Sequence, residues 1–194
     1  MKFGDIMDIR KLYNILLEDN PSKELLNNEE ELFKLIPELR TCKGFNQNSD
    51  WHIYDVYNHI LHVVDYVPSD LVLRLAALFH DVGKPISYKE DENGIGHFYG
   101  HWEESQKIFE SFSNKYNLDK NMSNTISNLI YYHDMNIGKL NDLELKKIYN
   151  IFGIDGIDKL YKLKEADLLA QNKKYHYILK DYDKQKSKII IKKK

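Results

Sequence analysis

The sequence predicts an all-α fold, and three observations lead to this class. Apolar residues recur at spacings of three and four along most of the chain, which is the period of helices that bury one face. Polar or proline-containing segments such as residues 20–22 and 41–50 separate these stretches, and such segments typically end helices. Only residues 86–99 combine short apolar pairs with a strong turn signal, Asn93-Gly94, so we expect one short hairpin or loop insertion there.

The beginning of the chain predicts a small helical extension. One helical pattern covers residues 9–17 and stops at Asn20-Pro21-Ser22, and a second pattern covers residues 25–36. The polar segment 41–50 then predicts a connecting loop. We therefore expect residues 1–50 to form a two-helix N-terminal extension that packs on the main domain.

The next two helices have clear boundaries. Residues 54–67 carry an apolar face that ends at Pro68, and Ser69 is placed to cap the helix that follows. That helix, residues 71–79, is apolar at every position except Arg74. A segment so apolar on all sides is typical of a helix in the protein core.

Five further helices are expected after the insertion. They cover residues 101–116, 123–132, 143–152, 155–171 and 174 onward. We expect residues 51–175 to form the main domain and residues 176–194 to form a C-terminal helix with a basic tail. The lysine-rich end favours a frayed, solvated helix over an RNA-binding segment. Its isoleucines, residues 189–191, could pack on the body or on a second subunit, so a homo-oligomer stays open.

Composition excludes several classes of protein. With 194 residues the chain is long enough for one compact domain, and its formal net charge of −2 gives no reason to expect a protein that coats nucleic acid. Cys42 is the only cysteine, which excludes an internal disulfide and a cysteine-based zinc site. No signal peptide is recognisable, and no apolar run approaches the roughly 18 residues that cross a bilayer. We therefore expect a soluble, cytoplasmic protein with no membrane partner.

The pair His80-Asp81 is the strongest chemical signal in the sequence. It closes the apolar segment 71–79, where an imidazole and a carboxylate are costly to bury unless a positive charge compensates them. A divalent metal ion is the obvious candidate. Gly83 allows a sharp turn after the pair, and Lys84 brings a cation to the place where an anionic substrate would approach the metal. The alternative is a core histidine bonded to a backbone carbonyl beside a surface aspartate.

Other histidines could join this pair. His59 follows Asp55 by one helical turn, so the carboxylate could orient the imidazole ring. His97 and His101 stand at the start of one predicted helix, and His133-Asp134 stands at the end of the next. Because helix ends from distant segments can meet at the mouth of a site, these residues are candidates for metal or substrate binding.

In this order, the residues resemble the HD-domain superfamily of metal-dependent phosphohydrolases, which is named for its His-Asp pair. The family pattern of a histidine, a His-Asp pair and a distant aspartate is matched by His59, His80-Asp81 and Asp167. The stretches 54–59 and 96–101 look like the HD domain of bacterial tRNA nucleotidyltransferases, the CCA-adding enzymes. The paired carboxylates of a nucleotidyltransferase domain do not precede this region, so we expect a free-standing HD-domain helical bundle.

The resemblance implies a centre with one or two divalent metal ions. With two ions, Asp81 would bridge them, and the remaining ligands would divide into His59, His80 and Asp167 for one ion and His101 and His133 for the other. The alternative is a single ion with the last two histidines idle nearby. Ligands without thiolate suit manganese, iron, cobalt, nickel or zinc, and affinity order alone does not choose among them. Asp55 and Asp134 would orient the histidine ligands.

The resemblance also implies a reaction. A metal-activated hydroxide would hydrolyse a phosphate ester of a nucleotide or RNA end, in the manner of a 2′,3′-cyclic phosphodiesterase or phosphatase. Asp81 and Lys84 would be catalytic, Lys84 and His97 would contact the substrate, and the acidic loop 90–92 disfavours long duplexes. One alternative is a nucleoside mono- or triphosphate phosphohydrolase. Another, of a different class, is a non-catalytic, metal-braced RNA-binding or scaffold module.

Overall fold

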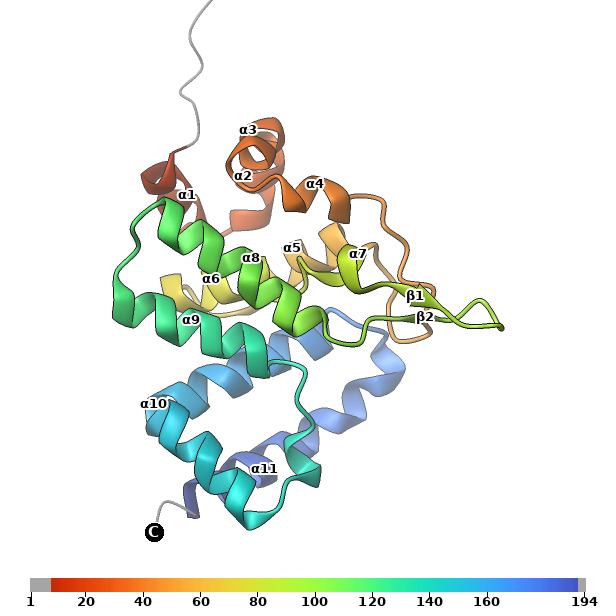
Figure 1. Cartoon of the computed structure of the whole chain (residues 1–194), viewed down its shortest axis with the longest axis vertical. Coiled ribbons are helices and arrows are strands. Elements are labelled where there is room, and N and C mark those ends of the chain that lie inside the picture. Colours follow the sequence, from red (N-terminus) through yellow and green to blue (C-terminus); the bar gives the residue numbers. More distant parts are fainter. Residues whose placement is uncertain (1–7, 192–194) are drawn as a thin grey trace, which may run out of the picture.

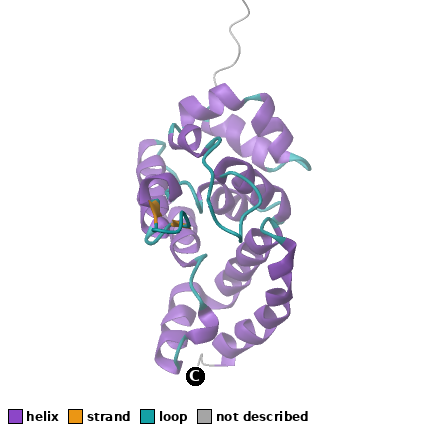
Figure 2. Ribbon diagram, turned by 90° about the vertical axis from the view of Figure 1, so that its right-hand side faces the viewer, coloured by secondary structure: helices purple, strands orange, loops and turns teal. Residues whose placement is uncertain are grey.

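The computed structural model describes residues 8–191 and confirms the all-α class. Helices dominate the ribbon, and within the described residues the strands are confined to one small hairpin (Figure 2). The elements in chain order are α1 Ile9–Leu16, α2 Pro21–Asn27, α3 Glu29–Leu35, α4 Glu38–Cys42, α5 Val56–Tyr66, α6 Leu71–Phe79, α7 Lys84–Ser87, β1 Lys89–Glu90, β2 Gly96–His97, α8 His101–Lys115, α9 Lys120–Tyr132, the 3-10 helix η1 Ile137–Lys139, α10 Asp142–Leu169, the 3-10 helix η2 Lys173–Ile178 and α11 Leu179–Ile191. Residues 1–7 and the last three lysines of the predicted basic tail lie outside the described residues.

The N-terminal extension contains more helices than the two that the sequence predicts. Asp8 starts α1 by accepting a hydrogen bond from the Lys11 amide at 2.8 Å. The predicted second helix is divided, because Asn28 has a non-helical backbone between α2 and α3, and Pro37 begins a separate α4. These four helices lie together above α5 and α6 in Figure 1.

Helices α5 and α6 form the centre of the molecule. Asp55 caps α5 and Asp70 caps α6, each by accepting a hydrogen bond from an amide of the first turn. The prediction that Ser69 caps α6 is wrong by one residue, because the Ser69 hydroxyl donates to the Leu17 carbonyl at 3.2 Å. Every residue of α6 from Leu73 to Phe79 is buried, as its apolar pattern predicts.

Arg74, the polar exception in α6, fastens the N-terminal extension to the core. Its Nε donates to the carbonyls of Val67 and Pro68 at 3.2 and 3.3 Å, and its Nη1 donates to the Leu16 carbonyl at 3.3 Å. A buried guanidinium must find acceptors for its hydrogens. These carbonyls lie at the end of α1 and in the turn between α5 and α6, so one side chain joins three elements.

The predicted hairpin is present between α7 and α8. Strands β1 and β2 pair antiparallel with Lys89 opposite His97, and Gly94 in the turn has a positive φ of 75°. The hairpin projects from the edge of the molecule in Figure 1. It brings β2 to the cavity described below.

The C-terminal part folds back along α10. Gly153, with φ 60° and ψ −170°, interrupts α10, which confirms the gap predicted between the helices at 143–152 and 155–171. Helix α11 then packs against α10 (Figure 1), with Ile189 buried in the core and Ile191 exposed. Among residues 8–191, no helix combines the length and the apolarity that crossing a membrane requires.

Candidate metal centre

The predicted metal ligands converge although they lie on five different helices. His59 lies inside α5, and His80-Asp81 follows the last residue of α6. His101 is the first residue of α8, His133 follows the last residue of α9, and Asp167 lies near the end of α10. Their ligand atoms form overlapping groups of three, and within each group the atoms lie within 4.8 Å of one another. All six residues predicted as ligands are therefore brought together.

Gly83 allows this convergence because a helix packs directly against it. A Cβ atom on Gly83 would lie 2.5 Å from the Ser105 amide nitrogen and 2.6 Å from the His101 carbonyl oxygen, both on the backbone of α8. The Gly83 amide donates to the Ser105 hydroxyl at 2.9 Å. Its φ of −82° is open to any residue, so close approach of α8, and not the sharp turn expected from the sequence, explains the glycine.

Backbone carbonyls fix the orientation of three imidazole rings. The Nδ1 atoms of His80, His101 and His133 lie 2.7, 2.8 and 2.7 Å from the carbonyl oxygen three residues earlier. A carbonyl oxygen only accepts, so each Nδ1 carries the hydrogen, and Nε2 of the neutral ring keeps a free lone pair. This is the tautomer that binds a metal through Nε2.

The two oxygens of Asp81 face different histidines. Oδ2 lies 3.2 Å from His80 Nε2 and 3.3 Å from His59 Nε2. Oδ1 lies 3.2 Å from His101 Nε2 and 3.5 Å from His133 Nε2. The side chain of Asp81 is only 1% exposed, and distances this short leave no space for a water molecule between the paired atoms. The arrangement fits a carboxylate that bridges two cations.

With the hydrogens of His101 and His133 on Nδ1, where backbone carbonyls accept them, the lone pairs of both Nε2 atoms face each other and Asp81 Oδ1. The two Nε2 atoms lie 3.3 Å apart, and burial lowers the pKa of His133, which favours its neutral ring. Despite its short distances, Asp81 Oδ1 has no hydrogen-bond partner within the described part of the chain. These lone pairs repel one another unless a cation lies among them. Imidazole and carboxylate without thiolate fit manganese, iron, cobalt, nickel or zinc.

The second group gathers around His59. Its Nε2 lies 3.3 Å from His80 Nε2 and 3.1 Å from Asp167 Oδ1. Gln171 donates to the same Asp167 oxygen at 2.9 Å, which holds the carboxylate in place. The side chain of Asp167 is 14% exposed and lines the adjacent cavity, so this group borders the space that a ligand would enter.

Neighbouring charges keep both carboxylates ionised. Burial by itself raises the pKa of Asp81, but His80 and Lys84 hold that pKa well below its usual range. Burial also raises the pKa of Asp167, but the hydrogen bond from His59 outweighs burial, so the pKa of Asp167 is lowered. Ionised carboxylates are the form that binds a metal ion.

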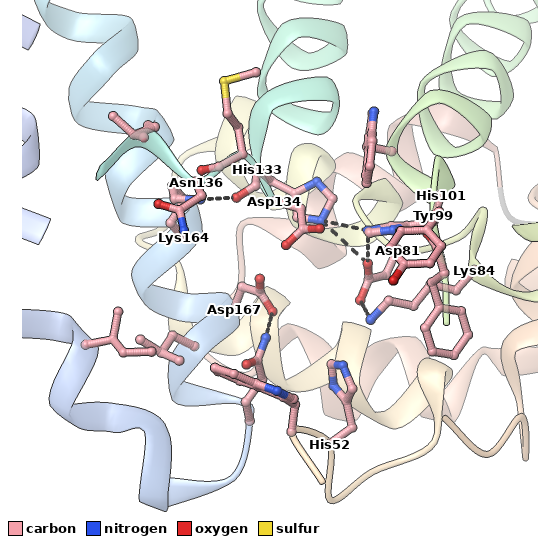
Figure 3. A pocket seen from close by; sticks show the side chains of 18 of the residues that line it. His52, Asp81, Lys84, Tyr99, His101, His133, Asp134, Asn136, Lys164 and Asp167 are labelled. Atoms are coloured by element: carbon pink, nitrogen blue, oxygen red, sulfur yellow. Dashed lines mark hydrogen bonds and ion pairs between the residues drawn. The ribbon is translucent and has the colours of Figure 1, made fainter. Parts of the chain in front are cut away.

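A cavity of about 490 Å³ opens beside the cluster (Figure 3). Lys84 lies at its edge, with Nζ 2.7 Å from Asp81 Oδ2 and 2.8 Å from Gln47 Oε1. The ammonium also lies 5.3 Å from the centre of the Phe98 ring. Lys84 is therefore held next to the candidate bridging carboxylate, and its contact with a substrate stays a prediction.

The two residues predicted to orient the histidines, Asp55 and Asp134, do not take that role. The carboxylate of Asp55 accepts hydrogen bonds from the amides of Gly44 and Asn58, and His59 Nδ1 has no partner among residues 8–191, so Asp55 does not orient His59. Asp134 is exposed and lines the cavity. The ring of the preceding histidine is instead held by a backbone carbonyl.

His97 reaches the same cavity from the hairpin. Its Nε2 lies 3.0 Å from Asp91 Oδ2, and its ring stacks on Tyr99 with centroids 5.4 Å apart and planes 7° apart. Asp91 therefore fixes one ring nitrogen at the hairpin. A contact between His97 and a substrate stays a prediction.

Two cavity residues were missed by the sequence analysis. Lys164 is 7% exposed, donates to the carbonyls of His133 and Met135, and has its pKa lowered by burial. Its position three residues before Asp167, on the same helix face, is the one signal that could have found it. His52 also lines the cavity, and burial lowers its pKa to about 2. It lies in a polar loop where no pattern distinguishes it.

Several known proteins share part of this sequence. The multifunctional CCA protein of Janthinobacterium sp. (strain Marseille) is 28% identical over 142 residues, which cover 70% of this chain and 33% of that protein. The A-adding tRNA nucleotidyltransferase of Deinococcus radiodurans is 38% identical over 72 residues, which cover 34% of this chain and 16% of that protein. The CC-adding tRNA nucleotidyltransferase of Thermus thermophilus is 38% identical over 79 residues, which cover 38% of this chain and 18% of that protein.

The chain thus spans a third or less of the length of these relatives. A family model described as HD domain matches residues 51–184, which include every residue of the candidate centre. The match covers more than half of the chain. It follows that this chain belongs to the HD domain family, a superfamily of metal-dependent phosphohydrolases.

Proposed function

We propose that this chain hydrolyses a phosphate ester of a nucleotide or an RNA end, as a 2′,3′-cyclic phosphodiesterase or phosphatase. The observation that carries the proposal is the convergence of His101 Nε2, His133 Nε2 and the unpartnered Asp81 Oδ1 at the edge of a cavity, within the described part of the chain. The family supplies the reaction class. Two of the relatives are named as tRNA nucleotidyltransferases, which supports a nucleotide or RNA substrate.

Two divalent ions would be held by two sets of residues that share Asp81. One ligand set would be His59, His80 and Asp81, joined by Asp167, whose Oδ1 lies 3.1 Å from His59 Nε2 and 4.0 Å from His80 Nε2. The other set would be Asp81, His101 and His133. When bound, such ions supply an activated water and neutralise the charge that develops on the phosphate. Because Asp81 offers a different oxygen to each set, it is the residue on which both ions depend.

Lys84 is assigned to the phosphate. Its Nζ already contacts Asp81 Oδ2, so a phosphate oxygen near the centre comes within reach of the same ammonium without a large movement. Gln47 accepts a hydrogen bond from the ammonium, and the Phe98 ring lies within cation–π distance of it, so both hold Lys84 in position. His97, on the hairpin side of the cavity, is assigned to a hydrogen bond with the ester part of the substrate.

The test combines metal content with product analysis. Protein purified without chelator is expected to carry a divalent metal by elemental analysis and to release product from 2′,3′-cyclic AMP. Preferential turnover of AMP or of deoxynucleoside triphosphates would replace this proposal with the nucleoside phosphate alternative. Bound metal with no turnover of any of these substrates would contradict catalysis and support a metal-braced binding module.

A further inference from the structure

Two segments far apart in sequence are fastened together at the rim of the cavity. The Asn172 amide donates to the Trp51 carbonyl at 2.8 Å, and its side chain donates to the Asp50 carbonyl at 3.1 Å. The Asp50 carboxylate accepts from Lys174 Nζ and, at 3.2 Å, from the Tyr175 hydroxyl. The rings of Trp51 and Tyr175 stack with centroids 3.5 Å apart and planes 10° apart. We name these five residues the clasp.

Beyond the clasp, the C-terminal segment forms a wall of the cavity. Ile178, Tyr182 and Gln185, from η2 and α11, line the same space as the candidate metal ligands. Figure 1 shows this segment in blue, leaving the end of α10 and running down beside it. The hairpin residues Tyr99 and His97 line the cavity as well, and Figure 3 shows Tyr99 across Asp81 from Lys164. A ligand would therefore be flanked by the wall and by the hairpin.

The charges around the cavity do not suit the backbone of a long RNA chain. The wall residues Ile178, Tyr182 and Gln185 are uncharged. Lys84 is paired with Asp81, and Lys164 is bonded to two backbone carbonyls. Proteins that hold single-stranded RNA along its length use a positively charged groove, whereas the lining described here leaves only Lys84 for a phosphate, because Lys164 is bonded to two backbone carbonyls.

We propose that the clasp and the C-terminal wall restrict this site to a phosphate ester about the size of one nucleotide and exclude the rest of an RNA chain. The inference rests on the proposed function and narrows its substrate from nucleotides or RNA ends to mononucleotides. A cavity of about 490 Å³ falls within the range of pockets that enclose small molecules, about 300–1,000 Å³. The clasp matters because it holds the segment directly before the wall against the loop that leads into α5.

Both tryptophans of the chain, Trp51 and Trp102, line the cavity, so intrinsic fluorescence reports binding without turnover. Manganese-loaded protein is titrated with adenosine 3′-monophosphate and with a trinucleotide that ends in the same 3′-phosphate. The mononucleotide is expected to bind about tenfold more tightly, because the chain of the longer ligand meets the wall. Equal affinity of the two ligands for the wild-type protein would overturn the inference.

Opening the clasp provides the second arm of the test. Tyr175→Ala removes the stacking partner of Trp51, and Asp50→Ala breaks the same clasp from the loop side. Each variant is expected to reduce the tenfold preference to about twofold. Tyr177→Ala is the matched control, because Tyr177 lies in the same 3-10 helix, is 60% exposed and does not line the cavity.

The outcomes separate this inference from the proposed function. A preference that persists unchanged in both clasp variants would overturn the role of the clasp. Binding preference without hydrolysis of either 2′,3′-cyclic AMP or a cyclic-phosphate trinucleotide leaves the restriction in place and contradicts the proposed activity. Hydrolysis of both with equal kcat/KM supports the activity and overturns the restriction.

Discussion

A histidine binds a metal through Nε2 only when its hydrogen lies on the other ring nitrogen, so the partner of Nδ1 decides its chemistry. In this protein the carbonyls of Ala77, Phe98 and Ile130 take that role for three of the four clustered histidines. Each carbonyl belongs to the residue three positions before its histidine, at or next to a helix end. A helix end thus supplies both the ring and the acceptor that orients it.

The two ligand sets predict different metal losses. His101→Ala removes one donor from the group that includes His133, and we expect it to lower the bound metal by one equivalent while the other set remains. Asp81→Ala is expected to remove both. His62→Ala on α5, whose ring contacts Tyr54 and Tyr66 outside the cluster, is the control. An unchanged metal content of the His101 variant would contradict a dinuclear centre.

Lys164 is expected to stabilise the folded protein through its two buried hydrogen bonds. In Lys164→Met, the carbonyls of His133 and Met135 lose their buried donor, which is expected to lower the free energy of unfolding by about 2 kcal/mol. Lys162→Met on the same helix removes only an exposed pair with Asp158 and is expected to cost less than about 0.5 kcal/mol. Denaturant unfolding measures both, and equal losses would contradict the role given to Lys164.

At the scale of whole elements, sequence periodicity predicts the helices well but places their ends less well. Ser69 and Asp70 are both good N-cap residues, and the choice between them is made by the Leu17 carbonyl, which takes the Ser69 hydroxyl. Helix α9 starts at Lys120, before the predicted residue 123, because Asp119 caps it. These ends depend on neighbours from other segments or on polar residues outside the apolar pattern. Periodicity therefore contains no information about them.

The cap of α6 gives a test at this scale. Asp70→Ala removes both the cap and the ion pair with Lys159 of α10, and is expected to lower the free energy of unfolding by about 1–2 kcal/mol. Lys159→Ala removes only the pair and is expected to cost less than about 1 kcal/mol. Chemical unfolding of the two variants compares them directly. If the lysine variant loses as much as the aspartate variant, the cap is not the main contribution.

The difference in free energy of unfolding between wild type and Asp70→Ala is expected to depend on pH. Burial raises the pKa of Asp70, while the hydrogen bonds from Lys159 and the Leu73 amide outweigh it and lower the pKa in the folded protein. A lowered folded-state pKa gives stability that is present above the unfolded-state pKa and is lost as pH falls through the folded-state pKa. The difference between wild type and Asp70→Ala is therefore expected to be full at pH 7 and to shrink below about pH 4. A difference that stays constant down to pH 2 would contradict this account.

At the scale of the whole molecule, the candidate centre exists only when five helices are packed together. His80-Asp81 could be identified locally, because a polar pair at the end of an apolar helix needs compensation. Asp167 could not, since its surroundings in sequence fit an ordinary helix edge, and its selection depends on the family pattern. His52 reaches the cavity through long-range packing alone, and no local pattern encodes that, whereas Lys164 could be found only through its position three residues before Asp167.

Because the centre joins α5, α6, α8, α9 and α10, metal binding is expected to stabilise the entire fold. A ligand that binds only the folded state at a hundredfold excess over its Kd adds about 2.7 kcal/mol. For a chain of 194 residues this corresponds to a rise in Tm of about 5–10 °C when manganese is added to chelator-treated protein. Asp81→Asn, which keeps the shape of the side chain but removes the bridging charge, is expected to abolish the rise. Differential scanning calorimetry with and without manganese measures the shift, and a similar rise in both proteins would place the metal elsewhere, since only the wild type retains the carboxylate that both histidine groups face.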